Sequence, residues 1–113
     1  MSQPVLLFKE HSVSRKTVFR YGELFLMVRR YPDVYLPSAY EKNHVWMIYV
    51  KGKSGKVLYW VEERREFHYA RFKVKQIAEC LGIKKENVAF EDVSTDEEEK
   101  HTVEEFTEVI NNG

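Results

Sequence analysis

The stretch that decides the fold runs from residue 45 to residue 61 and reads VWMIYV-KGKSGK-VLYWV. Two runs rich in β-branched and aromatic residues, 45–50 and 57–61, flank a segment with glycines at positions 52 and 55. Such runs favour strands, and glycines accept the backbone angles of tight turns. The stretch therefore predicts an antiparallel hairpin with a basic tip, formed by Lys51, Lys53 and Lys56.

The remaining elements follow outward from this hairpin. Residues 24–28 are apolar throughout, which is typical of a central strand, and residues 5–8, 67–71 and 88–90 are candidates for shorter strands. A change of period follows, because apolar residues at positions 74, 77, 78 and 81 fall on one face of a helix that Gly82 ends. We therefore predict an α+β fold: an antiparallel sheet of four or five strands, one packed helix at about 73–82, and an acidic C-terminal extension.

The helix and its glycine leave a second interpretation open. The segment from Gln76 to Ile83, with Val88 after it, resembles the first helix and turn of a helix-turn-helix. The second helix would then begin near Lys84 and would carry three acidic residues by position 92. Such a helix is too acidic to enter a DNA groove, so a helix followed by a strand is the preferred interpretation.

The charges divide the chain into two parts. Residues 1–85 hold 17 Lys or Arg and 8 Asp or Glu, a net charge of +9, whereas residues 86–113 hold 1 and 10, a net charge of −9. We predict a basic, aromatic-rich domain over residues 1–90 and an acidic tail over residues 91–113. Such asymmetry bears on partners, because a basic body attracts polyanions and an acidic tail competes for the same surface.

The tail has a pattern of its own. Thr102 and Glu105 fit a capping box, and three apolar residues follow at helical spacing: Val103, Phe106 and Ile110. A helix this short is marginal alone, so it is expected to dock on its own domain, on a second copy of the chain or on another protein. These three residues are the predicted contacts for a protein partner.

Aromatic residues lie among the basic ones in the first part of the chain. All but two of the 7 Tyr, 7 Phe and 2 Trp fall within residues 1–72. Rings that stack on bases and cations that follow phosphates suit single-stranded nucleic acid, and rings also fill small cores. The predicted phosphate contacts are Arg20, Arg29, Arg30, Lys51, Lys53 and Lys56, with Tyr31 and Tyr49 as stacking platforms. On a strand, Trp46 shares a face with the apolar Ile48 and Val50, and Met47 shares the other with Tyr49.

The sequence contains few candidates for catalytic groups. The four histidines and the single cysteine, Cys80, have no partners at metal-ligand spacing, so neither a metal nor a cofactor is expected. Glu66 and His68 would share one face of a strand, beside Arg64 or Arg65, which is a weak candidate for RNA cleavage. The leading hypothesis is thus a non-enzymatic nucleic-acid-binding protein. The alternative is an accessory subunit or inhibitor that binds a protein through its sheet and tail, or a homodimer.

Length and composition set the remaining limits. The length of 113 residues and an apolar content of 43% predict a single domain. No apolar run approaches the length needed to cross a membrane. A lone cysteine and an N-terminus without a long apolar run favour a cytoplasmic location. The composition, with abundant Lys, Arg and Glu and few Gln and Asn, resembles that of proteins from thermophiles.

Overall fold

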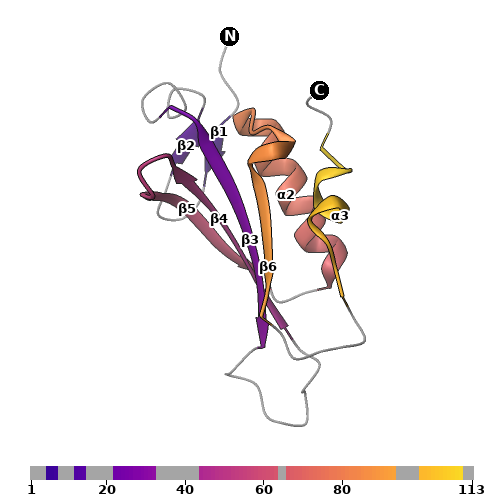
Figure 1. The fold of residues 1–113 in the computed structure, drawn as a ribbon. Coiled ribbons are helices and arrows are strands. Elements are labelled where there is room, and N and C mark those ends of the chain that lie inside the picture. Colours follow the sequence, from indigo (N-terminus) through magenta and orange to yellow (C-terminus); the bar gives the residue numbers. More distant parts are fainter. Residues whose placement is uncertain are drawn as a thin grey trace.

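The computed structural model describes residues 5–7, 12–14, 22–32, 44–63, 66–93 and 100–110. A four-stranded sheet has the order β5-β4-β3-β6, with helices α2 and α3 on one side of it (Figure 1). Its strands are β3 (Leu24–Pro32), β4 (His44–Gly52), β5 (Val57–Glu63) and β6 (Val88–Asp92). A separate antiparallel pair consists of β1 (Val5–Leu7) and β2 (Ser12–Ser14), the latter within a segment with no predicted strand.

The predicted hairpin is confirmed. β4 and β5 pair antiparallel, with Tyr49 opposite Trp60 and Ile48 opposite Val61. A register shift between Val50 and Lys51 precedes the turn, where Gly55 has a φ of 91°. That left-handed backbone angle costs little only for glycine, which explains the residue at this position.

The sheet is mixed rather than antiparallel, which corrects part of the prediction. β3 pairs antiparallel with β4, but β6 pairs parallel with β3, with Leu26 opposite Val88. The chain leaves β5 at one edge, passes through α2 (Phe67–Leu81) and returns as β6 at the other edge. A helical crossover between strands at opposite edges gives them the same direction, and it confirms the α+β class.

Helix α2 begins six residues before its predicted start. Residues 67–71, predicted as a strand, form its first turns, and it ends at Gly82, whose φ is 71°. The 3₁₀ turn η2 (Lys85–Asn87) and then β6 follow, so the helix-turn-helix interpretation is wrong. Within the described residues, no helix is long and apolar enough to span a bilayer.

One hydrophobic core lies between the sheet and the helices. Alternate residues of the strands point into it, and α2 contributes its apolar face. The buried members are Leu24, Leu26, Val28, Trp46, Ile48, Val50, Tyr59, Ala70, Val74, Ile77, Ala78, Leu81, Ile83, Val88, Phe106 and Ile110. Trp46 is thus a core residue, as its position beside Ile48 and Val50 allows.

The short helix α3 (Val103–Thr107) is part of this core. Phe106 is fully buried, and its ring centroid lies 5.1 Å from that of Phe90 and 5.2 Å from that of Phe67. The His101 ring stacks on Phe67 at 3.9 Å, just before the helix begins. Tilted and edge-on ring contacts of this kind add to the stabilisation that burial alone provides.

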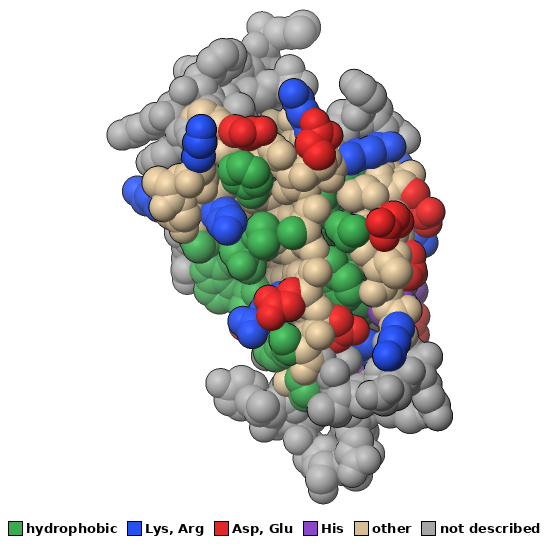
Figure 2. Space-filling model, in the orientation of Figure 1, with side chains coloured by type: hydrophobic (Ala, Val, Ile, Leu, Met, Phe, Trp, Pro, Cys, Tyr) green, Lys and Arg blue, Asp and Glu red, His purple; other side chains and the backbone are tan. Residues whose placement is uncertain are grey.

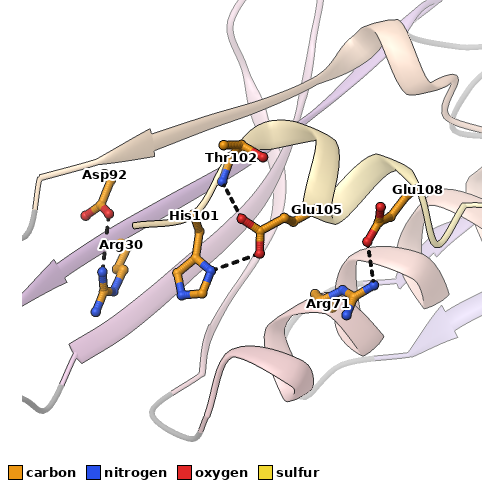
Figure 3. A network of polar contacts seen from close by, with 7 residues as sticks. All are labelled: Arg30, Arg71, Asp92, His101, Thr102, Glu105 and Glu108. Carbon is orange, nitrogen blue, oxygen red and sulfur yellow. Dashed lines mark hydrogen bonds and ion pairs between the residues drawn. The ribbon is translucent and has the colours of Figure 1, made fainter. Parts of the chain in front are cut away.

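Polar contacts hold the start and the end of α3 (Figure 3). The backbone N–H of Thr102 donates to the Glu105 carboxylate at 3.0 Å, as the predicted capping box requires. Glu105 also accepts from His101 at 3.1 Å, and this hydrogen bond is the main cause that lowers the pKa of Glu105. At the other end, Arg71 of α2 donates to Glu108 at 3.1 Å.

Candidate functional site

The two faces of the sheet differ in what covers them. The inner face packs against α2 and α3, while residues at the alternate positions point to the opposite side. Phe25, Met27, Met47, Tyr49 and Lys51 are half-buried there, and Val57 and Trp60 are exposed, at 48% and 47%. We define the outer face as Phe25, Met27, Arg29, Tyr31, Met47, Tyr49, Lys51, Val57, Trp60, Glu62, Ala89 and Glu91. Figure 2 shows hydrophobic side chains gathered over the strands on the left of the view, among charged ones.

A shallow groove of about 650 Å³ crosses this face over β4 and β5. Its lining consists of Arg29, Met47, Tyr49, Lys51, Gly55, Val57, Trp60 and Glu62. The central pair is Tyr49 and Trp60, which are directly opposite each other on paired strands. Opposed residues on paired strands have their side chains on the same face of the sheet, and both rings line this groove. A volume of this size matches small-ligand sites in general.

Cations lie at both ends of the groove. Lys51 and Val57 are opposite each other next to the aromatic pair, and the exposed Lys53 and Lys56 continue into the turn. That turn is closed by two backbone hydrogen bonds of 3.0 Å each, from Gly52 to Lys56 and from Gly55 to Gly52. The lysines of the hairpin tip therefore stand on a structured turn beside the groove.

At the other end, Arg29 of β3 is half-exposed and lies 3.7 Å from the Glu91 carboxylate. Ion pairs between exposed side chains contribute little, so this contact leaves the guanidinium available to an anionic ligand. Glu62 of β5 is opposite Met47, which is itself opposite Arg29, so the three residues form one row across the strands. The groove thus has two cations and one acid in its lining.

Four of the predicted nucleic-acid contacts come together on the outer face: Arg29, Tyr31, Tyr49 and Lys51. Tyr31 lines a smaller adjoining hollow of about 360 Å³ with Arg29, Met47 and Tyr49. Lys53 and Lys56 lie at the hairpin tip next to this face. Arg20 lies outside the described residues.

Arg30 was predicted to contact phosphate, and the structure corrects this. Its side chain is 1% exposed, on the inner side of β3, because neighbouring residues on a strand point to opposite faces. It donates to Asp92 at 3.3 Å and to the Nδ1 atom of His44 at 3.1 Å, and it lies over the Trp46 ring. Arg30 therefore tethers the end of β6 to β3 and β4 and contributes no surface cation.

The predicted partner contacts in the tail also need correction. Phe106 and Ile110 are 0% and 1% exposed, and Val103 packs against the same core. Of the three docking possibilities left open by the sequence, the structure has the helix on its own domain. The apolar stripe packs against the core of its own domain, so Phe106 and Ile110 are inaccessible to a partner and Val103 is only partly exposed.

The residues of the groove that were not predicted as contacts from the sequence are Met47, Gly55, Val57, Trp60 and Glu62. The outward position of Trp60 follows from the register shift between Val50 and Lys51, which places Trp60 rather than Tyr59 opposite Tyr49. Tyr59 consequently points inward and is 1% exposed, and burial raises its pKa well above the usual range. The sequence of residues 57–61 indicates that Tyr59 and Trp60 point to opposite faces, but it does not give the register that decides which of them faces outward.

Glu66 and His68, the candidate catalytic pair, do lie close together, but at the start of a helix rather than on a strand. His68 Nδ1 lies 3.3 Å from the Glu66 carboxylate at the start of α2, and both side chains are largely exposed. Arg64 and Arg65 lie outside the described residues. His68 lines an open hollow of about 350 Å³ with Arg71, Phe72, Lys75 and Val109, but Glu66 is not part of that lining. A pair this exposed does not exclude water from a substrate. Among the described residues, no group of three or more His, Cys, Asp or Glu side chains is placed to hold a metal ion.

Comparisons with protein-family models, curated proteins and solved structures gave no match to this chain.

Proposed function

We propose that this protein binds single-stranded nucleic acid on the outer face of its sheet, without catalysing a reaction. The observation that carries the proposal is the Tyr49–Trp60 pair, which lies in an open groove with cations at both ends. Every base has a π-face, so an exposed aromatic surface accepts bases without regard to sequence.

The exposure of Trp60 argues that the ring has a task outside the core. Tryptophan is usually well buried, and here 47% of it is exposed although the core lies on the other side of the same strand. Stacking of one base on one ring contributes about 1–3 kcal/mol to binding. Two adjacent rings therefore supply a useful share of the affinity of a weak, non-specific binder.

The cations supply the electrostatic part. Four side chains surround the aromatic pair: Arg29 at one end, and Lys51, Lys53 and Lys56 at the other. If all four replace counterions on the phosphates, the logarithm of the binding constant falls with the logarithm of salt concentration at a slope of about −3.

A single strand fits this face better than a duplex does. The rings are presented on a sheet, and bases reach them only when they are unstacked from their neighbours. A duplex is read by an element that enters a groove, and within the described part of the chain both α-helices, α2 and α3, lie on the other side of the sheet (Figure 1). We expect similar affinities for RNA and DNA, because no residue of the outer face as defined above is assigned to a 2′-hydroxyl.

The experiment is fluorescence-anisotropy titration of labelled oligothymidine and oligouridine of about 12 nucleotides, at low and moderate salt. Trp60→Ala is expected to weaken binding roughly tenfold, at the level of one lost stacking contact. Phe72→Ala is the matched control, because Phe72 is 63% exposed on α2, on the other side of the sheet. It is expected to leave binding unchanged.

Two results would overturn the proposal. One is an absence of binding by the wild-type chain at low salt. The other is an equal loss in Trp60→Ala and Phe72→Ala. The same face is apolar enough to take a second copy of the chain or another protein. Light scattering at several concentrations tests the homodimer directly, and a dimer that Trp60→Ala dissociates would place the aromatic pair in a protein interface instead.

A further inference from the structure

The groove contains a carboxylate, which adds a hydrogen-bond acceptor to a lining of rings, aliphatic side chains and cations. Among the described residues that line it, Glu62 is the one acid, next to Trp60 and in the same row as Arg29. We propose that the groove recognises a guanine base, with Glu62 and Arg29 contacting its edge while its ring stacks on Tyr49 and Trp60. This inference rests on the proposed function and names the base that the same site prefers.

The register places the two contacts on the same side of the aromatic pair. Glu62 and Met47 lie two residues along their strands from Trp60 and Tyr49, and Arg29 is opposite Met47. Two residues on a strand correspond to a rise of about 7 Å, which is comparable with the width of a base. A base that covers the rings therefore extends its edge toward this row.

The opposite side of the pair suits the phosphates. Lys51 is two residues from Tyr49 in the other direction, and Lys53 and Lys56 lie beyond it on the turn. A nucleotide on the rings is thus oriented by charge: the phosphate toward the lysines and the base edge toward Glu62 and Arg29. This orientation also keeps the Glu62 carboxylate away from the phosphates, which it repels.

The chemistry of the edge selects guanine among the bases. An ionised carboxylate only accepts hydrogen bonds, and it accepts two side by side when the donors are parallel. Guanine offers such a pair, N1–H and the N2 amino group, whereas adenine and cytosine offer one amino group beside an acceptor nitrogen. Thymine and uracil offer one N–H between two carbonyl oxygens, which the carboxylate repels. Arginine completes the match on the neighbouring edge of the base, where it donates to guanine O6 and N7.

The groove makes this contact more effective than it would be on an open surface. Glu62 is half-buried against the lining of the groove, so a base that covers it excludes further water. Hydrogen bonds between charged groups and a ligand strengthen as water is excluded. One good two-point contact to a base gives about 1–3 kcal/mol of discrimination, or roughly tenfold in affinity.

The test compares labelled oligothymidine of about 12 nucleotides with versions that carry one central guanine, adenine or cytosine. The wild-type chain is expected to bind the guanine version roughly tenfold more tightly than oligothymidine, with the other two between them. Glu62→Gln is expected to reduce the guanine preference to about threefold or less while binding to oligothymidine is retained or improved. Glu104→Gln makes the same charge change on α3, away from the outer face, and is expected to keep the full preference.

A competition arm separates a strand from a free nucleotide. Guanosine monophosphate and thymidine monophosphate are added in turn to the complex with the guanine oligonucleotide. Displacement by the guanosine nucleotide alone supports guanine recognition, and displacement at a concentration comparable with that of the oligonucleotide would make the nucleotide the true ligand. Equal affinity for all four oligonucleotides, or a preference unchanged in Glu62→Gln, would overturn the inference and leave the proposed function standing. No binding to any strand would overturn the proposed function itself.

Discussion

Replacing Phe106 with alanine is expected to destabilise the whole domain, although this residue lies near the end of the chain. The side chain is fully buried, and its ring has three aromatic neighbours within 6 Å, namely Trp46, Phe67 and Phe90. Large-to-small substitutions of buried phenylalanine cost about 3–5 kcal/mol, and the lost ring contacts favour the upper part of that range. We expect a loss of about 4 kcal/mol in the free energy of unfolding, against the 5–15 kcal/mol typical of a domain.

The measurement is urea denaturation of Phe106→Ala beside Phe72→Ala, followed by tryptophan fluorescence and far-ultraviolet circular dichroism. Phe72 is 63% exposed, so its replacement is expected to change stability by less than about 0.5 kcal/mol. A loss of about 4 kcal/mol lowers the melting temperature by on the order of 15 °C in a domain of this size. If the two variants unfold at the same urea concentration, α3 is not docked on the core as described.

Two further predictions concern pH and the end of α2. Because the pKa of Glu105 is lowered, chiefly by the hydrogen bond from His101, its ionised form stabilises the fold above the ordinary carboxyl pKa, and this is lost as pH falls through the lowered value. Glu105→Gln should therefore unfold with a shallower pH dependence in the acid range than the wild type does, and superimposable profiles would contradict this. Gly82→Ala should lower stability by about 1–2 kcal/mol, because Gly82 has a φ of 71° and only the backbone angle opposes a methyl group there. Gly→Ala at this position with no change in the melting temperature would show that α2 does not end in a left-handed residue.

Local pattern predicted some elements of this fold well. The hairpin of β4 and β5 has strand-forming runs and turn glycines within 20 residues, so all of its determinants are local. The end of α2 at Gly82 and the capping box of α3 are local for the same reason. The helix start at Phe67 was missed because residues 67–71 alternate like a strand, although Phe67 and Ala70 continue the helical stripe that faces the core.

The parallel partner of β3 could not be predicted in the same way. Val88 pairs with Leu26, which is 62 positions earlier, and the choice depends on where α2 carries the chain. The same difference between local pattern and long-range contacts applies to the candidate site. Strand alternation predicts that Arg29 and Arg30 point to opposite faces, but it does not say which of the two faces outward. That is decided by the core and by Asp92, which receives the buried guanidinium from the end of β6.

The position of β6 has a consequence for folding during synthesis on the ribosome. A ribosome completes β3, β4 and β5 before it reaches Val88, and until then the residues Leu26–Arg30 of β3 lack the parallel partner that β6 provides. Exposed edges of apolar strands are sites of intermolecular pairing. Chains that are interrupted during synthesis, or cleaved before position 88, therefore expose a strand edge that β6 covers in the complete fold. Premature termination should yield aggregates rather than a smaller soluble domain.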